Sequence, residues 1–230
     1  MSAGRPPTLT AERGLITATE ILVAGCDEVG RGALGGPVSV GMVVVDATTG
    51  RPPADLRDSK LLAPAVRESL VPEIQAWAHS WAVGHANARE IDDMGILRAL
   101  RLAGERALAL LSVRPGKFLL DGNYDWLTRP ARAKASPLEV GPGQVRLEVR
   151  GDQTCASVAA ASVLAKVERD RMMVELARKH PGYGWEANKG YGAPAHRKAL
   201  AILGPCEQHR KSWHLVDDDE TAPLDTGSGD

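Results

Sequence analysis

One glycine-rich stretch constrains the fold more than any other part of the sequence: VAGCDEVGRGALGGPVSVGMVVVD, at residues 23–46. Two apolar segments flank the glycines, a pattern typical of two β-strands and a turn. The glycines also match the GxGxxG spacing of a dinucleotide-binding turn, which requires a helix directly after them. Here Asp46 follows Gly36 by only ten positions, whereas a parallel crossover needs a dozen residues or more. The stretch therefore predicts two antiparallel strands joined by a glycine-rich turn.

The remaining patterns predict an α/β chain with a mixed sheet. Further strands are expected at WAVGHAN, GKFLLD and QVRLEVRGD, which are short, largely apolar runs. Apolar spacing predicts helices over 64–80 (interrupted at Pro72), 89–111, 154–179 and near 194–203. Strands interleaved with helices are typical of a sheet that is covered by helices on its faces.

Length and cysteine content favour a single-domain protein of a reducing compartment. A chain of 230 residues with 43% apolar residues suffices for one sizeable domain. Cys26, Cys155 and Cys206 fit neither a disulfide framework nor a metal-ligand spacing. The sequence opens with no signal-peptide pattern and has no apolar run near the roughly 20 residues of a membrane span. We expect a cytoplasmic protein that is not attached to a membrane.

Charge is distributed unevenly along the chain. The formal net charge is −1, with 28 basic against 29 acidic residues. Six of these acids lie in the segment 217–230, which has no base, so the rest of the chain carries 28 bases against 23 acids. We predict a disordered acidic tail there, because the segment is acidic and poor in apolar residues. The body of the protein therefore has the excess of positive charge expected of a nucleic-acid-binding protein.

The region after Pro181-Gly182 mixes glycines, aromatic residues and bases. Basic side chains can pair with phosphates, and aromatic rings can stack on sugars or bases. A solvated basic helix with aromatic side chains in a core explains the same pattern. His196 and His209 are interpreted as phosphate contacts or as structural groups. The bases and rings are Arg178, Lys179, Lys189, Arg197, Lys198, Arg210, Lys211, Tyr183, Trp185 and Tyr191.

Four acidic residues stand where predicted strands end. Asp27 and Glu28 lie at the end of the first strand, Asp121 follows FLL, and Asp152 follows VRLEVRG. Open α/β sheets collect their functional sites at the carboxyl ends of strands. Four carboxylates without matching bases repel one another unless divalent cations neutralise them, and oxygen ligands suit Mg²⁺ or Mn²⁺. A solvated strand end followed by a turn is the simpler interpretation of Asp27 and Glu28 taken alone.

Taken together, these segments resemble the ribonuclease HII (type 2 ribonuclease H) family. The resemblance rests on GCDEVGRGALGGPV, DSK, LLDGNYDWL, RGDQTCASVAAASVLAKVERD, NKGYGAPAHRKAL and GPCEQHRKSW, which occur in the expected order over most of residues 21–213. It implies a ribonuclease H-like mixed sheet flanked by helices, with a small C-terminal helical subdomain. With the composition of the two ends, this divides the chain into a flexible segment 1–18, a catalytic domain 19–180, a basic and aromatic helical subdomain 181–216 and the acidic tail 217–230, which lies outside the resemblance.

The resemblance also implies an activity. It is that of a metal-dependent endonuclease that hydrolyses the RNA strand of RNA–DNA hybrids and cuts 5′ of single ribonucleotides in duplex DNA, leaving a 3′-hydroxyl and a 5′-phosphate. Such an enzyme uses two divalent ions, Mg²⁺ or Mn²⁺, and serves DNA replication and ribonucleotide excision repair. We expect a monomer whose partners are RNA–DNA hybrid and ribonucleotide-containing DNA.

Site residues follow from the resemblance motif by motif. The catalytic and metal-binding acids would be Asp27, Glu28, Asp121 and Asp152, and the substrate-binding residues would be Gly30, Arg31, Gly32, Lys60 and Tyr191. Arg150 stands where lysine is usual, and Trp213 where phenylalanine is usual. Type 3 relatives carry lysine in the glycine loop and an additional N-terminal domain, so Arg31 and the short N-terminal segment favour type 2.

Hydrolysis by two ions sets requirements on the acids. We expect Asp27 to bridge the ions, because it is the inward acid of the central strand. Adjacent strand residues point to opposite faces, so Glu28 can join Asp27 only if the strand ends or bulges there. Asp152 is expected near a helix N-terminus, which favours its ionised form. Ribonuclease chemistry through a histidine pair stays open on composition, because the chain has six histidines.

Two other classes of function compete with the endonuclease. A non-catalytic nucleic-acid-binding module with a structural metal would use the same basic surface, and a cleavage assay distinguishes it. A nicotinamide-dependent oxidoreductase would use the glycine loop, and the absence of a helix pattern after that loop argues against it.

Overall fold

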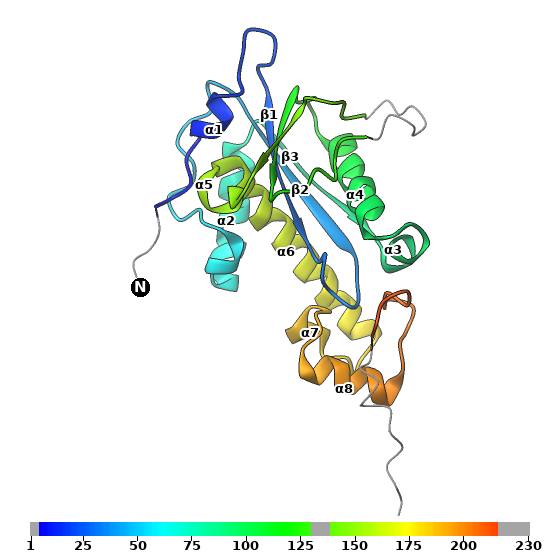
Figure 1. Ribbon diagram of the computed structural model, residues 1–230. Coiled ribbons are helices and arrows are strands. Elements are labelled where there is room, and N and C mark those ends of the chain that lie inside the picture. The colour runs from blue at the N-terminus through cyan, green and yellow to red at the C-terminus, as the bar shows by residue number, and fades with distance from the viewer. Residues whose placement is uncertain (1–4, 130–138, 216–230) are drawn as a thin grey trace, which may run out of the picture.

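The computed structural model describes residues 5–129 and 139–215, and it contains a five-stranded mixed sheet of order β3-β2-β1-β4-β5 (Figure 1). The strands are β1 (Val23–Val29), β2 (Val38–Val45), β3 (Ser80–Ala86), β4 (Lys117–Asp121) and β5 (Val145–Glu148). β1, β2 and β3 pair antiparallel, whereas β4 joins β1 and β5 joins β4 in parallel. The predicted antiparallel pair around the glycine loop is thus confirmed, and the dinucleotide-binding arrangement is excluded.

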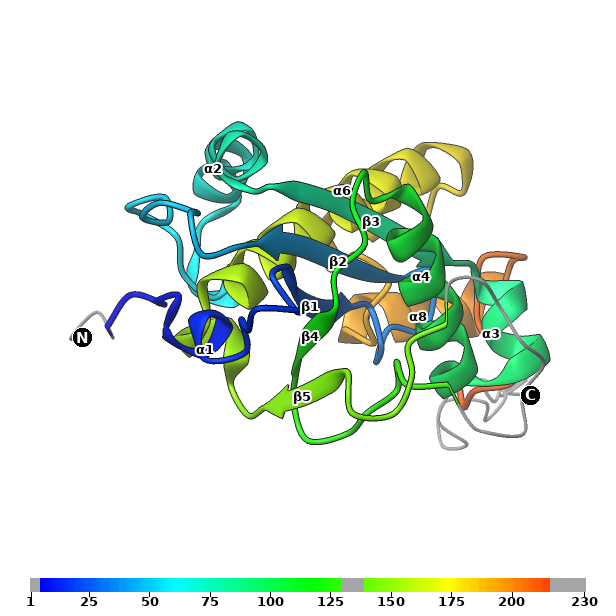
Figure 2. The same ribbon diagram turned by 90° about the horizontal axis from the view of Figure 1, so that it is seen from above.

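Helices cover both faces of the sheet (Figure 2). α4 (Ile96–Leu110) packs on one face, where Ala24 and Cys26 of β1 belong to its core. α6 (Ala156–Lys179) and α2 (Pro64–Trp77) pack on the other. Glycine lets α6 approach closely, because a Cβ at Gly25 would collide with the backbone of α6. This close contact fixes the face of β1 on which Asp27 lies.

The predicted helices exist, but their ends differ. The helix expected over 89–111 is two helices, α3 (Ala88–Met94) and α4, because Gly95 between them takes a φ of 79°. The helix expected over 154–179 is preceded by a separate turn, α5 (Gly151–Thr154), since Cys155 is extended. The interruption expected at Pro72 is wrong: α2 continues through it, and the carbonyl of Glu68 that loses its donor belongs to an exposed residue.

The chain beyond α6 forms a second, smaller cluster. α7 (Trp185–Asn188) and α8 (Pro194–Leu203) pack against the far end of α6, which extends from the sheet to reach them (Figure 1). Their core includes Met173, Trp185 and Leu200. The short helix near 194–203 is confirmed.

The N-terminal segment, expected to be flexible over 1–18, contains a short helix within its described residues. Helix α1 (Thr10–Arg13) places Leu9 and Glu12 in buried positions. Glu12 accepts hydrogen bonds from the backbone N–H and the hydroxyl of Ser157, at 2.8 and 2.7 Å. A buried carboxylate needs such donors. Residues 1–4 and the acidic tail 217–230 lie outside the described residues. No helix in the described ranges is long and apolar enough to cross a membrane.

Candidate active site

Asp27 and Asp121 lie side by side on neighbouring parallel strands. The register of β1 and β4 pairs Cys26 with Leu120, so the next residue on each strand is an aspartate. Both face α6, because side chains alternate and Leu119 of β4 packs on that side. An Oδ1 of Asp27 accepts the Glu28 N–H at 2.8 Å, and Asp121 Oδ1 accepts the Gly151 N–H at 2.8 Å. The strand ends therefore bring two of the predicted acids together.

Glu28 points to the opposite face of the sheet from Asp27. β1 stays in register with β2 through Glu28 and Val29, so the bulge or strand end that the sequence analysis required does not occur. The indole N–H of Trp126 donates to Glu28 Oε2 at 3.2 Å, and the Arg31 guanidinium lies 3.5 Å from Oε1. These two contacts hold the carboxylate on the α4 side.

Asp152 enters the site from the short turn α5, not from the start of a long helix. Its Oδ2 lies 3.3 Å from the ammonium nitrogen of Lys60, whose side chain is otherwise exposed. Lys60 belongs to the 3₁₀ turn η1 (Ser59–Leu61), which Asp58 caps by accepting the Lys60 backbone N–H. Asp58, which belongs to the DSK motif, is a buried acid next to Asp152 that was not among the predicted site residues.

Burial is the main cause that raises the pKa of three of these acids, and neighbouring acids add to it. Burial raises the pKa of Asp27 to about 8, with further upward contributions from Glu28, Asp121 and Asp152, while a hydrogen bond with Ser162 opposes the shift. Burial also raises the pKa of Glu28, against the nearby Arg31 charge. For Asp152, burial raises the pKa first, followed by Asp121 and Asp58, while Lys60 lowers it. Negative charge is therefore concentrated here beyond what the neighbouring cations neutralise.

The carboxylate oxygens at this edge suit a hard cation, but they do not point toward one common position. Carboxylate oxygens are the ligands preferred by Mg²⁺ and Mn²⁺. Within residues 5–129 and 139–215, however, no three His, Cys, Asp or Glu side chains are grouped closely enough to hold one ion. The opposite orientation of Glu28 accounts for part of this separation. Ion binding requires the side chains to turn toward a common point.

The glycine loop beside these acids has one buried and one open glycine. Gly30 has a φ of 85°, and a Cβ there would collide with the Arg169 guanidinium. Its N–H donates to the Tyr191 hydroxyl at 3.2 Å, and its carbonyl accepts from Arg210 at 2.6 Å. At Gly32 a Cβ would meet nothing within 4 Å. Of the loop residues predicted to bind substrate, Arg31 and Gly32 are exposed and Gly30 is buried.

Two fully buried arginines, which the sequence analysis did not identify as buried, fasten this loop. Arg169 of α6 donates to the Pro37 carbonyl at 2.8 Å and to the Lys189 carbonyl at 3.0 Å. Arg210 donates to the carbonyls of Gly30, at 2.6 Å, and of Arg31, at 2.9 Å. The second cluster is thereby joined to the loop through main-chain oxygens.

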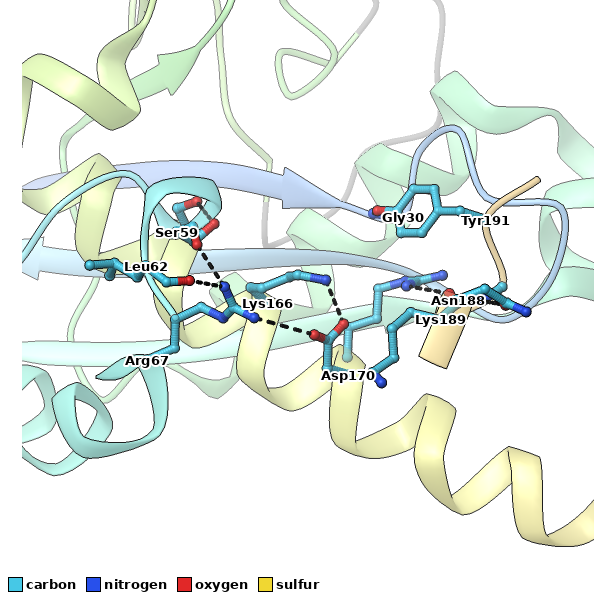
Figure 3. Close-up of polar contacts among 12 residues, drawn as sticks. Gly30, Ser59, Leu62, Arg67, Lys166, Asp170, Asn188, Lys189 and Tyr191 are labelled. Atoms are coloured by element: carbon cyan, nitrogen blue, oxygen red, sulfur yellow. Dashed lines mark hydrogen bonds and ion pairs between the residues drawn. The ribbon is translucent and has the colours of Figure 1, made fainter. Parts of the chain in front are cut away.

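A cavity of about 430 Å³ lies between α2, α6 and α7, on the Tyr191 side of the loop. Figure 3 shows Tyr191 next to Gly30, with Lys166 and Arg67 both directed at Asp170. The Lys166 ammonium lies 2.7 Å from Asp170 and 6.0 Å from the centre of the Tyr191 ring. Asp170 therefore forms a charge pair along α6 with Lys166.

The basic and aromatic stretch divides between surface and core. Tyr183 and Trp185 are buried and stack on each other at 5.1 Å between ring centres. His196 and His209 are also buried, which excludes the phosphate contacts left open from the sequence. Tyr191 is half-buried, its ring 5.3 Å from the Arg169 guanidinium. The core-aromatic interpretation holds for the first two rings.

Comparison with known proteins agrees with the resemblance seen in the sequence. The family model for Ribonuclease HII matches residues 24–216. A ribonuclease HII from Streptomyces avermitilis is 47% identical over 213 residues, covering 92% of this chain and 85% of that protein. One from Paracoccus denitrificans is 49% identical over 210 residues, covering 91% and 93% respectively.

Solved structures share the fold. The ribonuclease H2 of Pyrococcus horikoshii superposes with a TM-score of 0.67 at 25% identity, covering 87% of this chain and 97% of that one. The ribonuclease HII of Archaeoglobus fulgidus, solved in complex with PCNA, has a TM-score of 0.67 at 26% identity, covering 88% and 98%. The ribonuclease H-like mixed sheet predicted from the sequence is confirmed. The chain belongs to the ribonuclease HII family and is a ribonuclease H endonuclease.

Proposed function

We propose that this enzyme hydrolyses, with divalent metal ions, the RNA strand of RNA–DNA hybrids and the bond 5′ of a single ribonucleotide in duplex DNA. The observation that carries the proposal is the group of acids at the ends of β1 and β4. Burial and mutual repulsion raise the pKa of Asp27 to about 8, so a cation at this edge would relieve an existing cost. The adjoining glycine loop supplies a surface for a nucleic-acid strand.

Asp27, Glu28, Asp121 and Asp152 would hold two ions, Mg²⁺ or Mn²⁺. When bound, such ions activate water and stabilise charge on the phosphate and on the leaving oxygen. The Lys60 ammonium, 3.3 Å from Asp152 and largely exposed, would reach the phosphate at the same edge. Direct hydrolysis would leave a 3′-hydroxyl and a 5′-phosphate. The buried state of His196 and His209 argues against a histidine-based mechanism.

We assign recognition of the substrate to Gly32, Arg31 and Tyr191. Ribose differs from deoxyribose by a 2′-hydroxyl, so its recognition needs hydrogen-bonding groups close to the sugar. Gly32 is exposed and lacks a side chain that would hold its backbone away. The hydrogen bonds of Gly30 to Tyr191 and Arg210 engage its main-chain groups, so we assign it a supporting role. The Tyr191 ring would contact the following deoxyribose.

The decisive experiment uses a DNA duplex with one ribonucleotide, beside a uniform RNA–DNA hybrid. We expect cleavage of both with Mg²⁺ or Mn²⁺, and none with EDTA. End-group analysis should find the cut 5′ of the ribonucleotide, with a 3′-hydroxyl and a 5′-phosphate. Cyclic phosphate products, or equal cleavage in EDTA, would contradict the proposal.

A pair of glycine variants tests the loop. Gly32→Ala has free space for the methyl group, so it should fold normally and lose about 10-fold in cleavage of both substrates. Gly30→Ala should instead destabilise the fold by about 2 kcal/mol, because of its positive φ and the collision with Arg169. Normal cleavage by Gly32→Ala would show that the substrate does not approach this backbone.

The cellular setting follows from the proposed activity. Removal of ribonucleotides and RNA from DNA belongs to DNA replication and ribonucleotide excision repair, and we propose that it takes place in the cytoplasm. We propose a monomer as the active form, and light scattering of the purified enzyme at assay concentration tests it.

A further inference from the structure

A chain of hydrogen bonds connects two buried histidines to the backbone of Tyr191. The Cys206 N–H lies 3.0 Å from His209 Nδ1, and His209 Nε2 lies 3.1 Å from His196 Nε2. The indole N–H of Trp185 also reaches His196 Nε2, at 3.0 Å. His196 Nδ1 lies 2.8 Å from the Tyr191 carbonyl oxygen. Neither imidazole takes part in the proposed chemistry.

These contacts permit only one arrangement of protons. A backbone N–H and an indole N–H are donors only, so His209 Nδ1 and His196 Nε2 must be acceptors. His209 then carries its proton on Nε2, and the single lone pair of His196 Nε2 is shared between this proton and the indole N–H of Trp185. His196 carries its proton on Nδ1 and donates it to the carbonyl of Tyr191. Each ring is neutral and held as one tautomer.

The surroundings preserve this neutral state. Burial lowers the pKa of His196, and burial together with the neighbouring His196 lowers that of His209 to about 4. The charged groups around the pair are mostly basic: Arg197, Lys211 and His180. The acid of this region, Glu207, lies 3.8 Å from His180. Tyr183 and Trp185 contribute ring faces to the pair.

The chain ends at the residue assigned to the substrate junction. The Tyr191 carbonyl accepts the His196 proton and the Ala193 N–H, at 2.8 Å each, while its hydroxyl accepts from Gly30. His209 also forms a backbone bridge with Gly35, on the far side of the glycine loop. The histidines thus connect both sides of the surface that Tyr191 and the loop form.

We propose that His196 is a positioning residue for junction recognition, acting as an Nδ1–H donor that fixes the backbone of Tyr191, with His209 selecting that tautomer. This inference rests on the proposed function of Tyr191. It predicts that loss of the donor loosens Tyr191, and that cleavage at a lone ribonucleotide suffers more than cleavage of a uniform hybrid, which contains no RNA–DNA junction to recognise.

Two substitutions separate the donor from the rest of the ring. In His196→Asn the amide nitrogen can occupy the place of Nδ1 and keep the donor, whereas in His196→Gln the amide oxygen can occupy the place of Nε2 and keep only the acceptor. We expect His196→Gln to lower the ratio of kcat/KM for the lone ribonucleotide to that for the hybrid about 5- to 10-fold. His196→Asn should stay within about twofold of wild type in this ratio. Tyr191→Ala serves as the reference for lost junction recognition.

If the role of His196 were purely structural, the Asn variant would be more impaired than the Gln variant. Asn leaves the larger cavity and strands the donors of Trp185 and His209, so it would be the more harmful replacement. An Asn variant no better than the Gln variant, or equal losses on both substrates, would overturn the inference. If wild type cuts neither substrate, the proposed function fails instead, and the tautomers can still be tested.

The tautomers are directly measurable in the wild-type protein. Long-range ¹H–¹⁵N correlation spectra of histidine-labelled enzyme at pH 7 should show one histidine protonated on Nδ1 alone and one on Nε2 alone. The first signal should disappear in His196→Asn and the second in His209→Gln. Finding His196 protonated on Nε2, or charged, would overturn the inference whatever the cleavage assays give.

Discussion

Two regions of this molecule bury charged side chains in opposite ways. At the carboxylate edge, Asp27 and Asp152 are 6% and 3% exposed and have mainly other acids as neighbours. At the glycine loop, Arg169 and Arg210 are fully buried, and carbonyl oxygens surround both guanidinium groups. Among the residues that the structure describes, the first region has only Lys60 and Arg31 as partial counter-charges, while the second is supplied with acceptors by the backbone.

The difference distinguishes a binding site, the carboxylate edge, from a structural connection. We call this connection, made by the glycine loop with Arg169 and Arg210, the joint. A buried charge costs free energy unless partners compensate it. The loop supplies such partners, although Arg210 Nε has none and burial, with Arg169 nearby, lowers the pKa of Arg210 to about 9. At the carboxylate edge, compensation of the remaining negative charge would have to come from a bound cation. Substitutions in each region test one side of this contrast.

The largest effect is expected from Asp121→Asn, which removes one charge from the carboxylate edge. Cleavage should fall by about 100-fold or more, because a neutral amide is a poor ligand for a divalent ion. Folding and duplex binding should persist, since the amide oxygen can still accept the Gly151 N–H. Single-turnover cleavage and a binding assay measure the two quantities.

Asp125→Asn is the matched control for that variant. Asp125 caps a turn by accepting the N–H groups of Leu127 and Thr128, which an asparagine oxygen can also do. Its cleavage should stay within about twofold of wild type. If both aspartates behave alike, the charge of Asp121 has no special part in the reaction.

Replacing a buried arginine tests the joint. Arg210→Met should lower the free energy of unfolding by about 3 kcal/mol, because carbonyls of Gly30, Arg31 and Gly36 lose their donor. Arg171→Met removes an arginine that is 61% exposed and pairs with Glu68, so it should change stability by less than about 0.5 kcal/mol. Urea unfolding of both variants gives the values, and similar losses would contradict the structural role.

The stability measured over a range of pH tests the free-energy cost of burying Asp27 at the carboxylate edge. The pKa of Asp27 is about 8 in the folded protein, against about 4 when unfolded, so the folded state holds the extra proton between these values. Stability should therefore fall as pH rises from about 4 to about 8. Asp27→Asn removes this penalty and should be more stable than wild type at pH 8 by about 1–3 kcal/mol, but not at pH 4.

Asp46 provides the opposite case. Burial is the largest single influence and raises its pKa, but the hydrogen bonds from Thr48 and Thr49 together outweigh it and leave the pKa lowered. Asp46→Asn should therefore lose stability at neutral pH, and the difference should shrink as pH falls through the folded pKa.

Mg²⁺ should raise the Tm of wild type at pH 8 and have less effect on Asp27→Asn. If Mg²⁺ leaves the Tm of wild type unchanged, no cation binds at the carboxylate edge.

Local patterns were sufficient to predict the sheet and its hairpin. The valine-rich segments around the glycine loop, and the short distance from Gly36 to Asp46, correctly predicted β1 and β2 as antiparallel. The aspartate after FLL was likewise correctly placed at a strand end. These features depend on neighbours in the sequence, so periodicity and turn residues determine them.

Features that depend on distant partners were missed. Arginine is usually exposed, and the carbonyl that receives Arg169 Nε lies 132 positions away in the chain. Glu12 was placed in a flexible segment, because its donor Ser157 is 145 positions away. The orientation of Glu28 depends on β1 continuing past Asp27, which pairing with β2 decides. Gly95, at the break between α3 and α4, is a local signal that the single helix expected over 89–111 overlooked.

The smallest effect is expected from Tyr191→Phe, at the point where the joint meets the substrate. The hydroxyl accepts the Gly30 N–H at 3.2 Å, a long hydrogen bond, so its loss should cost about 0.5–1 kcal/mol of stability. The ring would keep its place 5.3 Å from the Arg169 guanidinium. Cleavage at a lone ribonucleotide should then fall only about two- to threefold, far less than in Tyr191→Ala. If Phe and Ala are equally impaired on that substrate while both cut a uniform hybrid normally, the hydroxyl, by holding Gly30, governs junction recognition and the ring does not.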